Sequence, residues 1–158
     1  MMNNDDALIL RAAHRSEASE IASISRLQIE HGLNWRWTPK RIKTLIADNQ
    51  TTLVVASMNG VIEGFGSMQF MNTKSHLILL AVQPKSRRCG IGKAIVKWLE
   101  KACGDGVVER IWLEVRLSNQ VARRFYEAQG YRFVRTIRKY YAKDEAAIVM
   151  EKLIKHAN

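Results

Sequence analysis

The stretch SHLILLAVQPKSRRCGIGKA, residues 75–94, contains the pattern that decides the fold. Residues 75–82 are nearly all apolar, as expected of a central strand that is buried on both faces. A basic segment with two glycines in G-x-G spacing follows, and from Ile91 the apolar residues recur at helical spacing. The stretch therefore predicts a buried strand, a tight glycine loop and a helix over residues 91–103, in direct succession.

A strand, a basic glycine loop and a helix in this order are typical of phosphate-binding sites. The N–H groups at the start of a helix have no partner within the helix, and the helix dipole favours an anion there. Positive charge around the loop comes from Lys85, Arg87, Arg88 and Lys93. The P-loop string is absent, and Ile95 replaces the small residue that ends the dinucleotide-binding fingerprint. On residue types alone, a solvated loop with ordinary helix-start glycines is an equal alternative.

The residues on either side predict the remaining elements. Asn59-Gly60 lies between two β-rich runs and is a strong signal for a hairpin turn. Ser16, Thr38 and Ser118 precede periodic apolar segments and are the expected helix N-caps. We expect strands over residues 7–13, 51–58, 61–70, 75–82, 107–116, 131–141 and 146–154, and helices over residues 16–31, 34–49, 91–103 and 118–130. This order predicts a mixed α/β sheet.

The composition narrows the class of protein. The chain has 158 residues, of which 47% are hydrophobic and 25% charged, so it can bury a full core as a single domain over residues 1–158. No apolar run reaches the roughly 18 residues that span a bilayer, and the acidic start MMNNDDALIL lacks the basic n-region of a signal peptide. Cys89 and Cys103 are too few for a disulfide framework, and no histidine lies at metal-ligand spacing to either. We therefore expect a cytoplasmic protein without a membrane span or a bound metal.

The net charge of +10 predicts an anionic partner. Nucleic acid, a phosphorylated cofactor, an acidic protein and a membrane surface would each fit. Basic residues recur at 85–93, 123–124 and 132–143, which are the predicted glycine loop, a helix exterior and a hairpin. No aromatic stacking platform or recognition helix accompanies them. A basic nucleic-acid-binding domain is thus the less favoured alternative to a cofactor-binding enzyme.

Two motifs resemble those of a known enzyme family. The pattern V-x-P-x-x-R-x-x-G-x-G over residues 82–92 resembles the acetyl-CoA signature of the GNAT superfamily of N-acyltransferases. The segment WLEVRLSNQVARRFYEAQGYRFV, residues 112–134, is similar to the stretch that these enzymes place next. The resemblance covers about residues 7–153 in element order. It implies the acyl-CoA N-acyltransferase fold: a mixed, mostly antiparallel sheet of six to seven strands with about four helices.

The resemblance also implies how acetyl-CoA would bind. In the family, strand backbone before the loop pairs with the pantetheine arm, main-chain N–H groups of the loop hold the pyrophosphate, and a later helix-start residue touches the cofactor. The matching residues here are Leu80, Ala81, Val82, Arg87, Arg88, Cys89, Gly90, Ile91, Gly92, Lys93 and Asn119. Close relatives tend to have arginine at the position of Cys89, and its loss should spare the backbone cradle. Acetyl-CoA is the expected co-substrate, and no metal is implied.

Amine acetylation requires a base for the amine proton, and an acid helps the thiolate to leave. The resemblance favours Glu114, in WLEV, as the base and Tyr126, in FYE, as the acid. Strand alternation places Glu114 on one face with Trp112 and Arg116. The alternatives are an ion pair of Glu114 with Arg116 or with a helix, and a core role for Tyr126. No serine–histidine or cysteine–histidine nucleophile is visible, which favours direct attack of the amine in a ternary complex.

Four aromatic residues are candidates for the acceptor channel: Trp35, Trp37, Tyr140 and Tyr141. They lie in regions that the family's architecture places around the acceptor, and contacts that cap the core are the alternative. The ending IRKYYAKDEAAIVM, residues 137–150, is similar to that of ribosomal-protein alanine N-acetyltransferases and related protein N-terminal acetyltransferases, although residues 145–147 read E-A-A where the family has E-D-A. The resemblance therefore implies acetyl transfer to a primary amine, with a protein or peptide α-amine favoured over a small-molecule amine. Monomer and homodimer both stay open.

Overall fold

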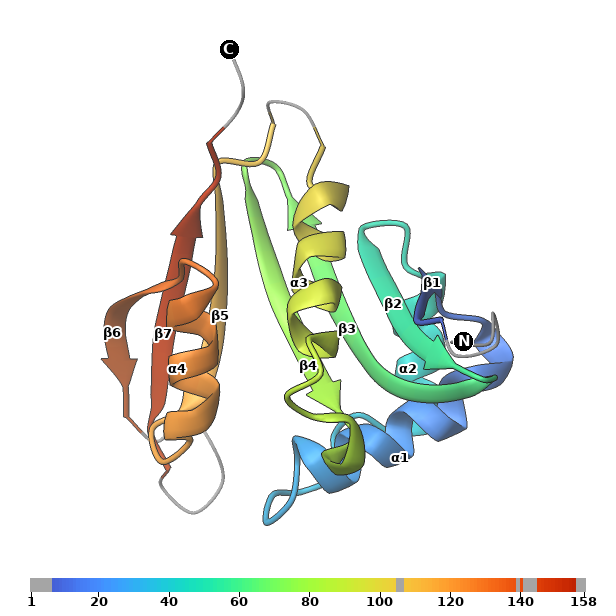
Figure 1. Ribbon diagram of the computed structural model, residues 1–158. Helices are drawn as coiled ribbons and strands as arrows, with labels where there is room; N and C mark the ends of the chain where they lie inside the picture. The colour runs from blue at the N-terminus through green and yellow to red at the C-terminus, as the bar shows by residue number, and fades with distance from the viewer. Residues whose placement is uncertain (1–6, 105–106, 139, 141–144, 156–158) are drawn as a thin grey trace. The chain divides into compact units, whose positions relative to one another are not determined.

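The computed structural model describes residues 7–104, 107–138, 140 and 145–155 (Figure 1). The strands are β1 (Ile9–Ala12), β2 (Thr51–Met58), β3 (Val61–Met71), β4 (Lys74–Val82), β5 (Arg110–Arg116), β6 (Arg132–Ile137) and β7 (Ala147–Leu153). The α-helices are α1 (Ala18–Gln28), α2 (Pro39–Ala47), α3 (Ile91–Ala102) and α4 (Gln120–Ala128), and the short 3-10 turns are η2 (Arg15–Glu17) and η3 (Pro84–Ser86). The chain divides into two compact units, Met1–Gln69 with Leu79–Ala102 and Phe70–Ile78 with Cys103–Asn158.

The sheet is mixed, as the sequence predicts. Among the described residues, seven strands follow the order β1-β2-β3-β4-β5-β7-β6. Strands β4 and β5 run parallel and pair residues 74–76 with 110–112. The pairs β1–β2, β2–β3, β5–β7 and β6–β7 are antiparallel. Together with the helices, this confirms the expected mixed, mostly antiparallel sheet. None of the helices in the described part of the chain is long and apolar enough to cross a membrane.

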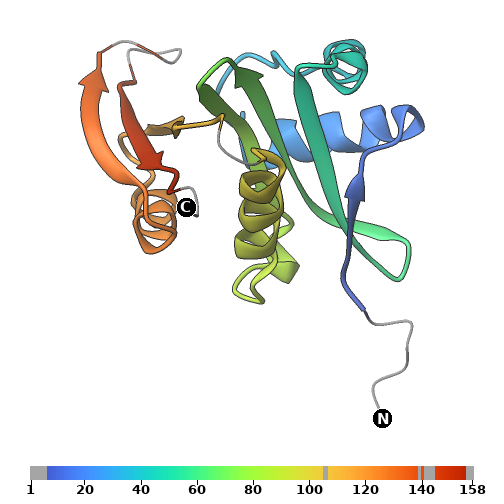
Figure 2. The same ribbon diagram turned by 90° about the horizontal axis from the view of Figure 1, so that it is seen from above.

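In the first unit, helices cover both faces of the strands. Helix α3 lies on one face of β2 and β3, and α1 and α2 lie on the other (Figure 1 and Figure 2). A Cβ atom at Gly64 would lie 2.8 Å from the Ala81 carbonyl oxygen, and one at Gly66 would lie 2.6 Å from Cγ2 of Ile95. Side chains are therefore excluded at both positions, and α3 packs directly on β3 through Ile95 and Leu99, which are fully buried.

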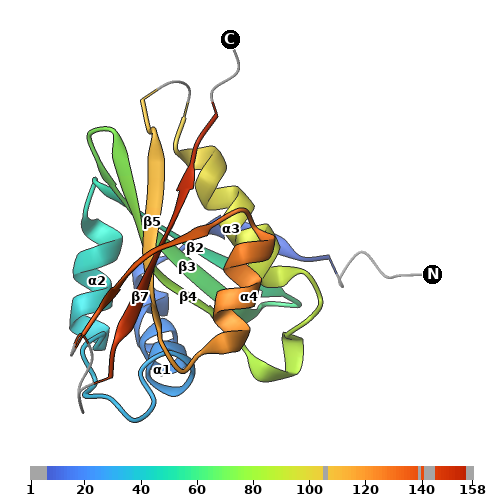
Figure 3. The same ribbon diagram turned by 90° about the vertical axis from the view of Figure 1, so that its left-hand side faces the viewer.

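In the second unit, α4 lies over one face of β5 and β7 (Figure 1 and Figure 3). The largest buried side chains there belong to Ile111, Leu113, Tyr131, Ile148 and Met150. Strand β6 is last in the strand order and so forms an edge of the sheet. Residues 132–136 are all exposed, and the register with β7 shifts between Phe133 and Arg135, so that Val134 is an extra, unpaired residue.

Two local predictions are confirmed. Asn59 and Gly60 both have positive φ, at 53° and 75°, which is typical of the type I′ turn of a two-residue hairpin and joins β2 to β3. Thr38 is the N-cap of α2, because its hydroxyl oxygen accepts the Arg41 N–H at 3.4 Å, and Pro39 occupies the first turn.

The predicted N-cap at Ser16 is wrong. Ser16 lies inside η2, and His14 takes the cap position because its backbone N–H donates to the Glu17 carboxylate at 2.8 Å. Arg11 holds the same carboxylate through two hydrogen bonds of 2.8 and 2.9 Å. The Arg11 guanidinium, together with the His14 N–H, keeps the pKa of Glu17 below its usual value. The chain therefore enters α1 through a 3-10 turn that is tied to β1.

The N-cap of α4 is displaced by one residue from Ser118. Oδ1 of Asn119 accepts the Ala122 N–H at 3.1 Å, whereas the Ser118 hydroxyl donates to Glu145. Serine and asparagine are about equally good caps, so adjacent Ser and Asn cannot be separated by residue type. In the structure, the Ser118 hydroxyl is bound to Glu145, and Asn119 caps the helix.

Strand β4 is less buried than its composition predicts. Its residues alternate: Ser75, Leu77, Leu79 and Ala81 are buried, whereas His76, Ile78, Leu80 and Val82 are half-exposed. The expectation of burial on both faces is therefore wrong. An apolar run shows that the side chains of a strand are hydrophobic, but it does not show whether other elements cover both faces of that strand. Two of the predicted cofactor contacts, Leu80 and Val82, lie on the open face.

Candidate functional site

The predicted glycine loop exposes bare backbone at the start of α3. Gly90 has φ +80° and Arg88 has φ +61°, so the chain passes through the left-handed region twice before the helix. The Ala94 N–H donates to the Gly90 carbonyl at 3.0 Å and makes the first bond of the helix. The N–H groups of residues 91–93 precede that bond and have no partner within the helix. The loop therefore presents several N–H groups to an anion at the positive end of the helix dipole.

A buried carboxylate on β3 fixes the turn that leads into this loop. Glu63 is 8% exposed and accepts a hydrogen bond from the Ser86 hydroxyl. Its carbonyl oxygen accepts the Gln83 N–H at 2.8 Å, and Lys85 Nζ lies 3.8 Å from its carboxylate. Sequence reasoning missed Glu63. The one feature of the sequence that could have indicated its role is a charged residue in the middle of an otherwise apolar β-rich run.

Arg87 acts on the loop itself. Its Nε–H donates to the Val82 carbonyl at 3.1 Å, and its second guanidinium nitrogen donates to Oε1 of Gln28 at 2.8 Å. The side chain therefore ties the loop to the end of β4 and to α1. Arg88 and Lys93 are exposed, and within the described residues neither has a recorded ion-pair partner. Their charges are available to an anion at the helix start.

The other candidates for cofactor contact differ in exposure. Ala81 is buried between the half-exposed Leu80 and Val82. Cys89 is an exposed free thiol whose sulfur lies 3.5 Å from a loop carbonyl oxygen. Asn119 belongs to the second unit, where its side-chain oxygen caps α4. Its predicted contact with a cofactor stays a prediction.

Glu114 is half-buried on β5 and is held by a histidine that sequence reasoning missed. Nε2 of His76 lies 2.6 Å from Oε2 of Glu114. The His76 ring stacks on Trp112, with ring centroids 4.7 Å apart and planes 3° from parallel. Among the described residues, Arg116 pairs with Glu145 at 3.9 Å, and the expected alternative of a Glu114–Arg116 ion pair is not found. The available signal was the one imidazole in the apolar run of β4.

The tyrosine candidates lie in different environments. Tyr126 is 9% exposed and makes edge-on contacts with Phe125 and Tyr131, at centroid distances of 5.1 and 5.7 Å. Its ring is thus packed in the second unit, and its predicted role as the acid stays a prediction. Tyr140 is exposed. Tyr141 lies outside the described residues.

The two tryptophan candidates lie in the connection between α1 and α2. Trp35 is exposed beneath the Arg26 guanidinium, at 4.7 Å from the ring centroid. Trp37 is half-buried and stacks with Arg41 at 4.1 Å. Each indole therefore has one face covered by a cation, which favours a defined ring orientation.

A second buried carboxylate holds this connection in place. Glu30 is 5% exposed and accepts the backbone N–H groups of Arg36 and Trp37 at 2.7 and 3.1 Å. It also accepts the Ser25 hydroxyl at 2.9 Å. These bonds satisfy the charge without a basic side chain, and they fix the backbone between the two tryptophans and at Trp37 itself. Sequence reasoning missed Glu30, because two of its three partners are main-chain N–H groups and the third is a serine hydroxyl.

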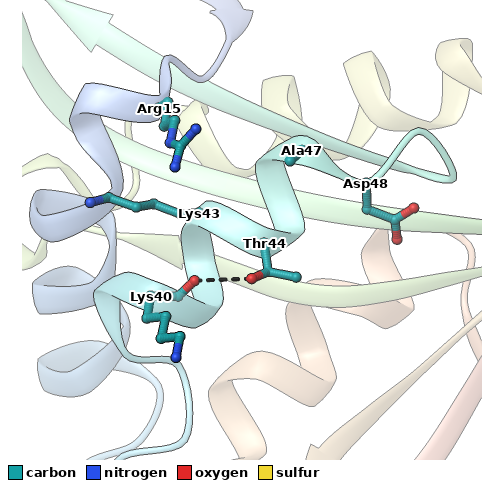
Figure 4. Close-up of a pocket in the computed structure, with 6 residues that line it drawn as sticks. All are labelled: Arg15, Lys40, Lys43, Thr44, Ala47 and Asp48. Carbon is teal, nitrogen blue, oxygen red and sulfur yellow. Dashed lines mark hydrogen bonds between the residues drawn. The ribbon is translucent and has the colours of Figure 1, made fainter.

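A basic hollow of about 530 Å³ lies elsewhere in the first unit (Figure 4). It is lined by Arg15, Lys40, Lys43, Thr44, Ala47 and Asp48. The Thr44 hydroxyl donates to the Lys40 carbonyl at 3.2 Å, which keeps that side chain turned toward its own helix (Figure 4). None of the predicted site residues lines this hollow.

The predicted site residues fall into two groups. The first unit carries the glycine loop, residues 80–82 and the two tryptophans, and the second unit carries Glu114, Tyr126, Asn119 and Tyr140. Within the described residues, no group of three metal-ligating side chains is close enough to hold a metal ion. The chemistry available is therefore an anion cradle in one unit and a histidine–carboxylate pair in the other.

Comparison with known proteins connects both groups to one family. Residues 15–131 match the Acetyltransferase (GNAT) family. An uncharacterized N-acetyltransferase of Methanocaldococcus jannaschii is 44% identical over 101 residues, which are 62% of this chain and 64% of that protein. An N-alpha-acetyltransferase of Sulfurisphaera tokodaii is 29% identical over 150 residues, which are 89% of this chain and 90% of that protein.

The Escherichia coli enzyme that acetylates the alanine of ribosomal protein bS18 is similar in sequence and in fold. It is 33% identical over 97 residues, which are 60% of this chain and 66% of that protein. The crystal structure of the E. coli enzyme has a TM-score of 0.82 at 24% identity, covering 96% of this chain and 97% of that chain. The sequence matches span slightly less than two thirds of the M. jannaschii and E. coli proteins. These findings confirm the resemblance and the fold that it implies.

We expect Glu30→Ala to loosen the connection between α1 and α2. The Arg36 and Trp37 amides would lose a charged acceptor, and such bonds contribute about 1.5–3 kcal/mol, so amide exchange there should speed up roughly ten- to hundredfold. Hydrogen-exchange mass spectrometry of the peptide over residues 30–38 measures this. Glu20→Ala, exposed on α1, should leave that peptide unchanged. Equal exchange in both variants would show that Glu30 does not hold the connection.

Proposed function

Because the chain belongs to the acetyltransferase (GNAT) family, we propose that it transfers the acetyl group of acetyl-CoA to the α-amine of a protein or peptide N-terminus. The observation that carries the proposal is the loop of exposed residues 88–90, which has two left-handed residues and leads directly into the start of α3. The acceptor class is supported by the N-alpha-acetyltransferase of S. tokodaii, whose similarity covers 89% of this chain. The bS18-alanine N-acetyltransferase of E. coli supports it over a shorter stretch.

The glycine loop fits the pyrophosphate of coenzyme A. Its helix-start N–H groups can donate to phosphate oxygens, and Arg88 and Lys93 add charge without an internal ion pair in the described residues. Arg87 would act indirectly, because its guanidinium already binds the Val82 carbonyl and Gln28. The half-exposed side of β4 at Leu80 offers the pantetheine arm a free strand face.

Gly90→Val should weaken acetyl-CoA binding roughly tenfold or more, because a branched side chain at φ +80° distorts the backbone cradle. Gly104→Val is the matched control: φ is +71° there, and an added Cβ meets open space at both positions. Both variants should lose about 1–3 kcal/mol of stability. Calorimetric titration with acetyl-CoA separates them, and equal affinity in the two folded variants would remove the loop from the cofactor site.

The proposed reaction is direct attack in a ternary complex. The acceptor ammonium first loses a proton to Glu114, the neutral nitrogen attacks the thioester carbonyl, and the C–N bond forms as the C–S bond breaks. The hydroxyl of Tyr126 would give its proton to the departing thiolate and regain the second proton of the amine nitrogen, while Glu114 would release the first amine proton to solvent. Each positioned acid or base contributes roughly 10²–10⁴-fold to the rate. Asn119 would contact the cofactor at the start of α4.

Glu114→Gln and Tyr126→Phe should each lower kcat roughly 10²-fold or more with little change in acetyl-CoA affinity, because each removes a proton-transfer group. Tyr131→Phe removes a hydroxyl from the same aromatic cluster and should change kcat less than about threefold. Steady-state kinetics with calorimetry measures both quantities. Losses of about tenfold or less in the first two variants would instead favour proton removal through water.

An α-amine suits this site better than a side-chain or polyamine nitrogen. Its ordinary pKa of about 7.7–8.0, against about 10.4 for lysine, makes the neutral form roughly 300-fold more abundant at neutral pH. A chain of net charge +10 also matches a polycation poorly. We propose that Trp35, Trp37, Tyr140 and Tyr141 line the acceptor channel, where rigid aromatic walls would favour a small first residue.

A peptide panel tests the acceptor class. Peptides that begin with Ala or Ser should be acetylated in preference to peptides that begin with Leu or Trp, because the aromatic walls crowd the first side chain. Spermidine and an N-blocked peptide with an internal lysine serve as competing acceptors. Turnover of spermidine or of the internal lysine, with α-amines untouched, would leave only the broader acetyltransferase assignment.

We propose a cytoplasmic enzyme without a nucleic-acid partner. Neither of the two cysteines forms a disulfide, which fits a reducing compartment. The basic residues of the glycine loop are explained by the cofactor, and no stacking platform accompanies the remaining ones.

A further inference from the structure

His76 and Glu114 form a pair within the second unit. Nε2 of His76 lies 2.6 Å from Oε2 of Glu114, and the two side chains are 20% and 15% exposed. Because an ionised carboxylate can only accept, we assign the proton of this hydrogen bond to Nε2. His76 is the register partner of Trp112 in the parallel pairing of β4 with β5. The strand pairing therefore brings the two rings together, and the stack keeps the imidazole plane parallel to the indole within 3°. The direction of the Nε2–H bond is thus set by the sheet.

Within the part of the chain that the structure describes, this arrangement uses one oxygen of Glu114. Oε2 accepts the histidine, and no contact of Oε1 is recorded among the described residues. The other charged groups on this strand face are engaged elsewhere: Arg110 lies 3.6 Å from Glu151, and Arg116 lies 3.9 Å from Glu145. Across the sheet, Glu114 faces the apolar Val149 of β7. His76 is therefore the polar group that orients this carboxylate.

We propose that His76 is a positioning residue for acetyl transfer: it holds Glu114 in one rotamer so that Oε1 points at the acceptor amine. The inference rests on the proposed function, in which Glu114 takes the amine proton. Because the pair is mostly buried, removing His76 should also cost stability. The test of its role is therefore the kcat of the folded variant and not the stability of that variant. The Trp112 stack supplies the orientation and the Nε2–H supplies the contact, and these two contributions can be separated by substitution.

Two substitutions at His76 separate the contribution of its aromatic ring from that of its hydrogen bond. His76→Phe keeps an aromatic ring over Trp112 and removes the hydrogen bond, whereas His76→Gln keeps an N–H donor at a similar reach and removes the ring. We expect His76→Phe to lower kcat roughly tenfold or more while KM for the peptide and for acetyl-CoA changes less than about twofold. His76→Gln should recover part of the loss. Lys74→Gln, exposed on the same strand, is the control and should keep the wild-type kcat.

The decisive measurement is a double-mutant cycle with Glu114→Gln. If His76 acts through Glu114, His76→Phe should change kcat less than about twofold once Glu114 has been replaced. Multiplicative losses in the double variant, or a normal kcat in His76→Phe, would overturn the inference. A wild-type protein that acetylates no amine would instead contradict the proposed function. In that case, the imidazole N–H signal of His76 in NMR spectra should still shift in Glu114→Gln if the pair exists, and an unchanged signal would exclude the pair itself.

Discussion

The close approach of α3 to β3 is the packing constraint on which the glycine loop depends. With no side chains at Gly64 and Gly66, Ile95 packs against strand backbone and α3 can lie close to the sheet. The chain must then pass from the end of β4 to the first turn of α3 within a few residues. Glu63 fixes the start of this connection: its carbonyl oxygen accepts the Gln83 N–H, and its carboxylate accepts the Ser86 hydroxyl. The left-handed backbone at Arg88 and the exposed amides follow from this short path.

Carboxylates inside a strongly basic chain hold the segments that carry the candidate site. The sequence has 25 basic and 15 acidic residues, yet Glu30 and Glu63 are buried and Glu114 is half-buried. Glu30 binds backbone amides, Glu63 binds a hydroxyl, and Glu114 binds His76. Hydrogen bonds to an ionised group are stronger than neutral ones, which suits connections that have few apolar contacts of their own. Most of the positive charge is left at the surface.

The order of elements, the hairpin at Asn59-Gly60 and the loop before α3 could be predicted because their signals are local: periodicity, turn chemistry and glycine spacing. The polar pairs could not. Glu63 meets Ser86, and His76 meets Glu114, across 23 and 38 residues, so no spacing rule reports them. The exposure of β4 was missed for a related reason, since it depends on which layers cover the strand.

The positive charge of the surface also affects the exposed edge strand β6. An edge strand presents unpaired N–H and C=O groups that can template pairing with another chain, and here Phe133 and Val134 add apolar side chains. Arg132 and Arg135 flank the unpaired residue, so the edge is kinked and cationic rather than flat. A second copy that approached edge to edge would bring arginine against arginine. The same excess of charge that attracts an anionic cofactor thus guards newly made chains against aggregation.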